Sequence, residues 1–209
     1  ILDAGADVNA KDSWGWTALH WASKESRPSV VKLLLDEKAD VNAKGNLNRT
    51  PLHWASMEGR TEVVNVLLEK GADVDARAED YYTALHHASK YGHPPVIRLL
   101  LDAGADIEAK ALNGETALWK ASYHWGIDAV RLLLEKGADV DATDMWGKTA
   151  LDYAHGDTEV IELLEKAQKR AQKKLTKSRT PKYKNRRRKV NPDFDRRRRG
   201  GKGKKTRRH

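Results

Sequence analysis

The chain has 209 residues and no cysteine, and its 39 Lys and Arg outnumber its 30 Asp and Glu, which gives a net charge of +9. The absence of cysteine excludes a disulfide-stabilised scaffold and a zinc site built on thiolates. No stretch reaches the roughly 18–20 consecutive apolar residues that a membrane-spanning helix needs, so we expect no membrane span.

The charge is divided unevenly along the chain. Residues 166–209 hold 22 Lys and Arg and two acidic residues, whereas residues 1–165 hold 17 Lys and Arg and 28 Asp and Glu. An acidic body is therefore joined to a strongly basic C-terminal segment, and we expect the two parts to have different roles.

A pattern with a period of 33 residues runs through the acidic body. Each unit starts with a threonine that precedes a small residue or proline and then leucine, and these threonines are Thr17, Thr50, Thr83, Thr116 and Thr149. A cluster of aliphatic residues follows, and a Gly-Ala-Asp sequence beginning at Gly71, Gly104 and Gly137 closes three of the units. Such self-similarity at a fixed period is typical of repeat architectures.

Each unit predicts two helices. Thr50 suits the N-cap of the first helix, because its hydroxyl can accept a backbone N–H, and Pro51 is tolerated at the first helical position. Pro28 stands where a second, leucine-rich helix begins, and Gly71 ends such a helix by taking the left-handed conformation. Lys38 occupies this glycine position in the first complete unit, so we expect Lys38→Gly to stabilise the fold by about 0.5–1 kcal/mol.

The period and the sequence Thr50-Pro51-Leu52-His53 resemble the ankyrin repeat. The resemblance implies an all-α solenoid of helix-turn-helix units, joined by short β-hairpins or turns and followed by a disordered basic tail. It also implies that His20, His53 and His86 fasten turn to helix by hydrogen bonds. We expect residues 1–10 to end a preceding repeat, residues 11–43, 44–76, 77–109 and 110–142 to be full repeats, residues 143–168 to be a shortened capping repeat, and residues 169–209 to be the tail.

The resemblance places the turn tips and first helices on one concave side, where a partner binds. The expected contact residues lie just before each repeat threonine or on the first helices, and they are Trp14, Trp16, Trp21, Leu47, Arg49, Trp54, Asp80, Tyr81, Tyr82, His87, Tyr91, Leu112, Asn113, Glu115, Met145 and Trp146. Large aromatic side chains are over-represented among energetic anchors of interfaces. The alternative interpretation is that the aromatic rings pack between adjacent repeats. This alternative applies most to Trp21 and Trp54, and in that case we expect these two rings to stack on each other.

The sequence offers no catalytic or metal-binding arrangement. His86 and His87 are adjacent on a helix, so they point about 100° apart and do not chelate one ion from one face. Gly147-Lys148-Thr149 imitates the end of a phosphate-binding loop, but Ala142 stands where that motif has its first glycine. We therefore expect no enzyme, no cofactor, no metal and no small-molecule substrate.

The basic segment begins as a helix that we expect to run from the last repeat through Gln172, with disorder from about Lys177 onward. Lys173 and Lys174, followed after eleven residues by Arg186, Arg187, Arg188 and Lys189, resemble a bipartite nuclear-import signal. A second cluster comprises Arg196, Arg197, Arg198 and Arg199. Basic runs serve nuclear import or contact RNA or DNA phosphates, and a third interpretation is a solvated tail that rests on the acidic body.

Three classes of function remain open. The first is an adaptor that recognises a protein through its repeats and is directed to the nucleus by its tail. The second is a nucleic-acid-associated protein whose tail supplies the affinity while the repeats recruit a protein. The third is the recognition portion of a larger enzyme. We expect the chain to act inside the cell, in the nucleus or the cytoplasm.

Overall fold

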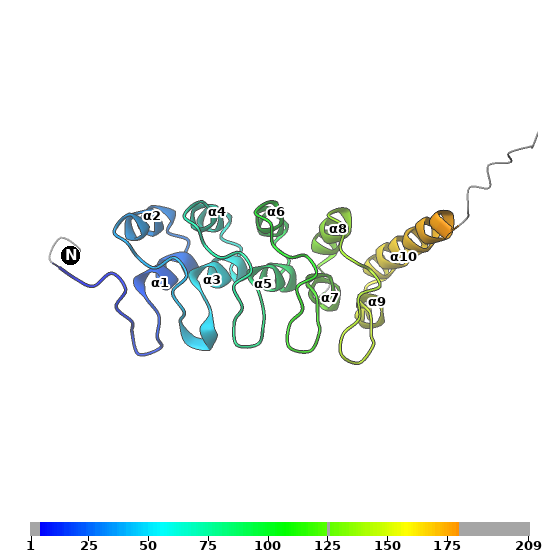
Figure 1. Ribbon diagram of the computed structural model, residues 1–209, viewed down its shortest axis with the longest axis horizontal. Helices are drawn as coiled ribbons and strands as arrows, with labels where there is room; N and C mark the ends of the chain where they lie inside the picture. Colours follow the sequence, from blue (N-terminus) through cyan, green and yellow to red (C-terminus); the bar gives the residue numbers. More distant parts are fainter. Residues whose placement is uncertain (1–4, 125, 180–209) are drawn as a thin grey trace, which may run out of the picture.

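The computed structural model describes residues 5–124 and 126–179 and shows a row of helix pairs (Figure 1). The first helices of the pairs are α1 (Ala18–Lys24), α3 (Pro51–Met57), α5 (Ala84–Lys90), α7 (Ala117–Tyr123) and α9 (Ala150–Tyr153). The second helices are α2 (Pro28–Asp36), α4 (Thr61–Glu69), α6 (Pro94–Asp102), α8 (Ile127–Glu135) and α10 (Thr158–Arg179), and a short 3₁₀ helix, η2 (Asn46–Asn48), precedes α3.

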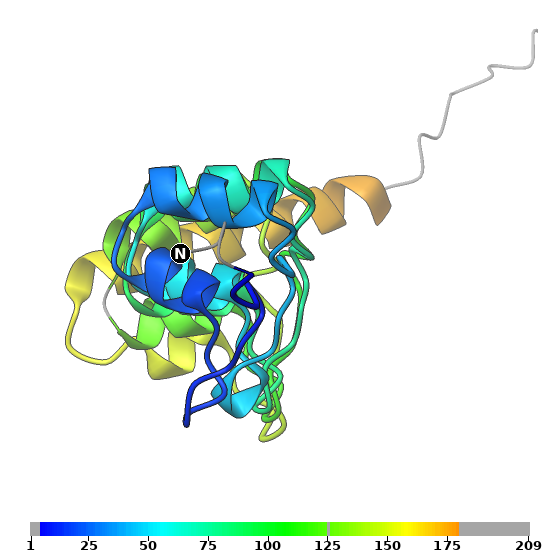
Figure 2. The same ribbon diagram turned by 90° about the vertical axis from the view of Figure 1, so that its left-hand side faces the viewer.

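The helices form two layers, and the turn tips form a projecting edge beside the layer of first helices. In Figure 1 the second helices α2, α4, α6 and α8 lie along one side, the first helices lie beside them, and the loops that precede the first helices project from the opposite side. Figure 2 shows the same layers from the end of the row. The prediction of an all-α solenoid of helix-turn-helix units is therefore confirmed. Within the described residues the connections are turns, with one antiparallel bridge between Thr143 and Thr149.

The repeat threonine and histidine together start each of the first three helix pairs. In α1, Nδ1 of His20 accepts the backbone N–H of Thr17 at 3.1 Å and lies 2.9 Å from the Thr17 hydroxyl oxygen. The hydroxyl in turn accepts the N–H of His20, which completes a capping box. The same pairs form between Thr50 and His53 and between Thr83 and His86. The helix starts predicted from the sequence are therefore correct.

The same histidines also join neighbouring repeats. Since Nδ1 accepts a hydrogen bond, Nε2 carries the proton, and it donates to a carbonyl oxygen 29 residues further on. The acceptors are Arg49 for His20, Tyr82 for His53 and Glu115 for His86, each at 3.0 Å. Burial lowers the pKa of His53 and of His86 to about 4, so both rings are neutral near pH 7. The predicted structural role of these histidines is confirmed.

A ladder of side-chain hydrogen bonds links the segments that follow the second helices. An oxygen on one side chain accepts the backbone N–H of an aspartate in the next repeat, and the pairs are Asn9 with Asp40, Asn42 with Asp73, Asp75 with Asp106 and Glu108 with Asp139, at 2.7 to 3.0 Å. The four accepting residues stand 33 positions apart. The segment before the first full repeat thus contributes to the array through Asn9.

The core is a row of equivalent leucines between the two helix layers. Leu19, Leu52, Leu85 and Leu118 are at most 1% exposed, and Leu67, Leu100, Leu133 and Leu164 are fully buried. These leucines belong to one core cluster that spans the repeats, and the helices of neighbouring repeats contact one another along the row, so stacking of the units buries their apolar faces.

Second helices end in the left-handed conformation, as the sequence predicts. Gly71, Gly104 and Gly137 have φ of +86°, +90° and +96°. Lys38 takes the equivalent position with φ of +70°, where a side chain costs free energy. The placement of Lys38 at a glycine position is therefore correct.

The last helix is longer than predicted. We expected it to end near Gln172 and the chain to be disordered from Lys177, whereas α10 continues to Arg179. Ala167 and Ala171 pack against the core, and lysine, arginine, glutamine and alanine all have high helix propensity, so the helix persists beyond the last turn that is covered. The expected repeat boundary between residues 168 and 169 falls inside this helix. None of the described helices is long and apolar enough to cross a membrane.

Candidate partner-binding surface

The turn tips of the later repeats are held at fixed spacing by the backbone. The N–H of Glu79 donates to the carbonyl of Leu47 at 2.9 Å, and the N–H of Leu112 donates to the carbonyl of Asp80 at 3.1 Å. The next tip continues the series, since Met145 donates to Asn113 at 2.9 Å. Side chains on successive tips therefore keep a constant relation to one another along the projecting edge in Figure 1.

Large apolar side chains stand exposed on these tips. The exposed fractions are 61% for Trp14, 68% for Leu112, 66% for Met145 and 60% for Trp146, and Leu47 and Tyr81 are also exposed. Every one of these residues belongs to the predicted contact set. Their exposure meets the requirement for direct contact with a partner, and the binding itself stays a prediction.

Tyr81 occupies an unusual backbone conformation. Its φ is +61°, and the equivalent positions hold Gly15, Gly114 and Gly147 with φ between +73° and +78° in three other repeats and Asn48 with φ of +56° in the second. A non-glycine residue in this region costs on the order of 1 kcal/mol, and the tyrosine ring, which lies 5.8 Å from the Arg77 guanidinium, is still 48% exposed.

Four tryptophans gather at the N-terminal end of the concave side. The ring of Trp16 lies 4.5 Å from that of Trp21 and 4.4 Å from that of Trp54, and Trp14 lies 6.0 Å from Trp21. We expected Trp21 and Trp54 to stack directly on each other if they pack between repeats. Instead, Trp16 lies between the two rings and contacts both. Trp16 and Trp54 are half-buried between the first two repeats, whereas Trp14 and Trp21 face solvent.

Asp12 holds this tryptophan cluster in place. Its Oδ1 accepts the backbone N–H of Trp14 at 2.9 Å and of Trp16 at 2.8 Å, and its Oδ2 accepts the indole N–H of Trp21 at 2.9 Å. Desolvation acts to raise the pKa of Asp12, but the hydrogen bonds from Trp21 and from the two backbone N–H groups outweigh it and lower the pKa.

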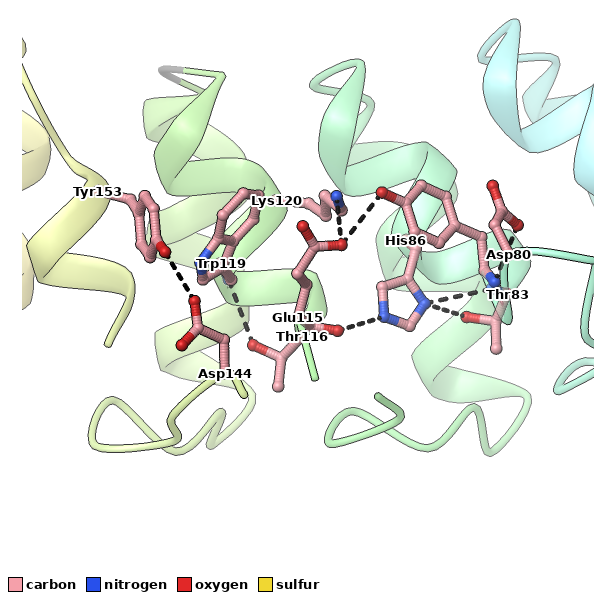
Figure 3. A network of polar contacts seen from close by, with 10 residues as sticks. Asp80, Thr83, His86, Glu115, Thr116, Trp119, Lys120, Asp144 and Tyr153 are labelled. Carbon is pink, nitrogen blue, oxygen red and sulfur yellow. Dashed lines mark hydrogen bonds and ion pairs between the residues drawn. The ribbon is translucent and has the colours of Figure 1, made fainter. Parts of the chain in front are cut away.

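The middle of the concave side is a buried polar cluster. The Lys120 ammonium lies 2.7 Å from Oε2 of Glu115, and the Tyr82 hydroxyl donates to the same oxygen at 3.2 Å. The side chains of Lys120 and Glu115 are only 6% and 10% exposed, and Figure 3 shows them between α5 and α7 beside His86. Desolvation lowers the pKa of Lys120 even though Glu115 acts to raise it, and desolvation raises the pKa of Tyr82.

Three predicted contact residues are therefore corrected. Glu115 is buried in the ion pair, Tyr82 is half-buried between repeats, and His87 is 3% exposed. Neither ring nitrogen of His87 has a hydrogen-bond partner among the described residues, and burial lowers the pKa of His87 to about 2, so the ring is neutral. These side chains contact the neighbouring repeat because a position that faces solvent in an isolated unit is covered when the next unit stacks on it.

The remaining predicted residues divide between the two environments. Arg49 is half-buried with its guanidinium 5.3 Å from the Trp54 ring, and Asp80 is half-buried and accepts the N–H of Tyr82. Asn113 is half-buried, whereas Tyr91 is exposed.

A second aromatic cluster was missed by the sequence analysis. The ring of Trp119 lies 5.1 Å from Tyr123 in a stacked arrangement and 4.7 Å from Tyr153, and Tyr123 is exposed. The Tyr153 hydroxyl donates to Asp144 at 2.8 Å, which Figure 3 shows next to Trp119. Trp119 could have indicated this cluster in the sequence, because it replaces the histidine that links neighbouring repeats at the same position of the earlier repeats.

The predicted basic site residues lie mostly outside the described part of the chain. Lys173 and Lys174 are exposed on α10, whereas the clusters 186–189 and 196–199 fall beyond it. Among the described residues, no group of three or more His, Asp or Glu is placed to hold a metal ion.

Comparison with protein-family models gives two matches, over residues 1–78 and 85–176, to a model described as ankyrin repeats (3 copies). The search of curated proteins found no match. The two matched ranges cover the helices described above except the first residue of α5 and the last three residues of α10. They include the predicted contact residues except Asp80, Tyr81 and Tyr82, which lie between the ranges.

Proposed function

We propose that this chain, which belongs to the ankyrin repeat family, is a non-catalytic adaptor that binds a protein through its turn tips and first helices. Ankyrin repeats are in general protein–protein interaction modules. The finer assignment, to this face and to these residues, rests on the geometry of the side chains.

The observation that carries the proposal is the row of exposed apolar side chains on a rigid edge. Trp14, Leu112, Met145 and Trp146 each expose at least 60% of their surface, although the core leucines are completely buried. Neighbouring exposed apolar groups that the fold itself does not use mark interaction sites, and aromatic residues are the strongest anchors at such sites.

Tyr81 supports the same conclusion independently. Its left-handed backbone conformation costs free energy that glycine at the same position avoids. Strain of this kind is concentrated at functional sites, and an exposed ring at a strained tip is suited to contact with a partner.

The test compares two variants of the full chain. The tip variant carries Trp14→Ser, Leu112→Ser and Trp146→Ser, and the control variant carries Val30→Ser and Leu33→Ser on the exposed side of α2. We expect a protein that is retained from an extract by the wild type and the control to be lost by the tip variant, with a loss of at least tenfold in affinity when the purified partner is titrated. Equal retention by all three proteins would refute the proposed face.

We propose in addition that the basic tail directs the chain to the nucleus. The support is the pairing of Lys173 and Lys174 with the arginine-rich cluster 186–189 at the spacing of a bipartite signal. A fluorescent protein fused to the full chain should accumulate in nuclei, and replacement of either cluster by alanine should reduce that accumulation. Unchanged nuclear accumulation in both variants would contradict this role.

A further inference from the structure

The C-terminal half of α10 presents only positive charges to solvent. Its cations from residue 166 to residue 176 are Lys166, Lys169, Arg170, Lys173 and Lys174, all exposed, and no acidic residue lies in that range. At about 100° per residue these side chains fall on one arc of the helix, which we call the basic arc. Ala167 and Ala171 lie beside this arc, on the side of the helix that packs on the core.

The basic arc is not neutralised within the described part of the chain. Lys169 pairs with Glu165 at 3.1 Å, and the other four cations form no ion pair with a described residue. Like charges four positions apart on a helix repel each other, and both Lys166 with Arg170 and Lys169 with Lys173 have this spacing. The helix therefore carries electrostatic repulsion that an anionic ligand would relieve.

The helix dipole does not account for the arrangement. It favours cations only in the last turn of a helix. Lys166 lies 13 residues, or more than three turns, before Arg179 at the end of α10.

A groove runs beside the basic arc. It has a volume of about 670 Å³ and lies between α10 and the α8 end of the fourth repeat. Lys166, Arg170 and Lys174 form one rim at a spacing of four residues, and the floor includes Ala167 and Ala171. Across the groove Arg131 adds a positive charge and Glu135 and Asp139 add negative ones, so the positive charge is concentrated on the α10 rim.

We propose that α10 binds duplex DNA, with the basic arc against the phosphates that flank the major groove. An α-helix with its side chains is 10–12 Å wide, and the major groove of B-form DNA is about 12 Å wide. The end of α10 extends away from the array in both Figure 1 and Figure 2, and all five cations of the basic arc are exposed, so the arc is accessible to a duplex. Contact through phosphates is tolerant of sequence and strongly dependent on salt.

Other anionic partners fit α10 less well. Single strands are held by aromatic rings that stack on bases, and α10 has no aromatic residue. Duplex RNA has a deep, narrow major groove that side chains do not enter. A lipid surface requires a broad face of large apolar residues, whereas Leu175 is the one large apolar residue from 166 to 176.

This surface is separate from the turn tips, so the proposal stands or falls independently of the proposed protein-binding face. The experiment titrates the full chain into a fluorescent 20-base-pair DNA of mixed sequence at several salt concentrations. The helix variant carries Lys166→Gln, Arg170→Gln and Lys174→Gln. Glutamine keeps high helix propensity, and circular dichroism verifies that the fold is retained.

Two matched variants also lose three positive charges each. The tail variant carries Arg197→Gln, Arg198→Gln and Arg199→Gln, and the body variant carries Lys32→Gln, Lys44→Gln and Arg98→Gln. We expect the wild type to prefer the duplex to a single strand of the same length, and the helix variant alone to lose that preference. The slope of log affinity against log salt should fall by about 2–3 in the helix variant, because each phosphate contact contributes about 0.9, and should not change in the body variant.

An unchanged salt slope in the helix variant would overturn the proposal. So would equal affinity of the wild type for duplex DNA, single-stranded DNA, duplex RNA or anionic phosphatidylserine vesicles. Loss of the duplex preference in the tail variant, with its retention in the helix variant, would place the contact outside α10 and would also overturn it.

Discussion

Two parts of the same strip of the array, one at its N-terminal end and one in its middle, use equivalent positions in opposite ways. The strip consists of the residue just before each repeat threonine and the residue four after it. Between the first two repeats these positions hold Trp16, Trp21 and Trp54, which form a partly exposed aromatic cluster. Between the third and fourth repeats they hold Glu115 and Lys120, which form a buried ion pair. One scaffold position thus serves either as an apolar contact surface or as a polar link inside the array.

The difference shows that the backbone of the repeat fixes where side chains meet but not what they do there. Trp16, Trp21 and Trp54 are not completely covered where the first two repeats meet, so part of each ring is accessible to a partner. A lysine and a glutamate fit beneath Tyr82 and Trp119, and once water is excluded they depend on each other. Four measurements test this difference between the two parts of the array.

We expect the largest change in the free energy of unfolding when the pH is lowered, because acid protonates the buried histidines of the second and third repeats. The folded-state pKa values of His53 and His86 are about 4, below the ordinary 6.5, so the unfolded chain binds more protons between these values. Their contribution is complete above pH 6.5 and is lost as the pH falls towards 4. From pH 7 to pH 5 we expect a loss of about 2 kcal/mol for each of the two histidines, measured by urea unfolding. In His53→Phe the dependence on pH should be smaller, and an equal dependence would contradict the assignment.

Lys120→Met should destabilise the array by about 3 kcal/mol, because it leaves Glu115 buried without its partner. Lys148→Met is the matched control, since Lys148 lies 3.8 Å from Asp152 in an exposed pair that contributes about 0–1 kcal/mol. Both are measured by urea denaturation at pH 7. Similar losses in the two variants would show that the central pair is no more important than a surface one.

Trp16→Ala and Trp14→Ala separate structural from surface tryptophans. Trp16 is half-buried between Trp21 and Trp54, so its loss should cost about 2 kcal/mol, whereas Trp14 is 61% exposed and its loss should cost less than about 0.5 kcal/mol. Thermal unfolding followed by circular dichroism gives both values. A larger loss for Trp14 than for Trp16 would reverse our assignment of the two rings.

The smallest effect is a gain in stability. Lys38→Gly should stabilise the chain by about 0.5–1 kcal/mol, because Lys38 has φ of +70° at a position where the other repeats have glycine. Gly71→Ala is the reciprocal change and should destabilise by a similar amount. A lower melting temperature for Lys38→Gly would show that the lysine makes a contribution that its exposed position conceals.

The repeat and its local chemistry could be predicted from the amino-acid sequence. The threonine caps, the histidine fasteners and the left-handed position of Lys38 follow from residues a few positions apart, and each recurs with the period of 33. Such features are local, so a single unit is sufficient to predict them. The exposed tips with Trp14, Leu112 and Trp146 were predictable for the same reason, since a turn tip projects from its own unit.

The assembled structure was needed to establish which of the remaining candidate residues are buried. His87 and Glu115 carry polar groups that suggest a surface, yet the next repeat buries them, and the sequence of one unit does not show how closely its neighbour approaches. Tyr123 was overlooked because Lys24 and Lys90 occupy the equivalent place in other repeats, and its role depends on Trp119 and Tyr153 beside it. The prediction also ended α10 too early, because lysine, arginine, glutamine and alanine continue the helix beyond Ala171, the last of its residues that packs on the core. Burial arises between units 33 residues apart, and for that reason it is read from the assembled array and not from the repeat motif.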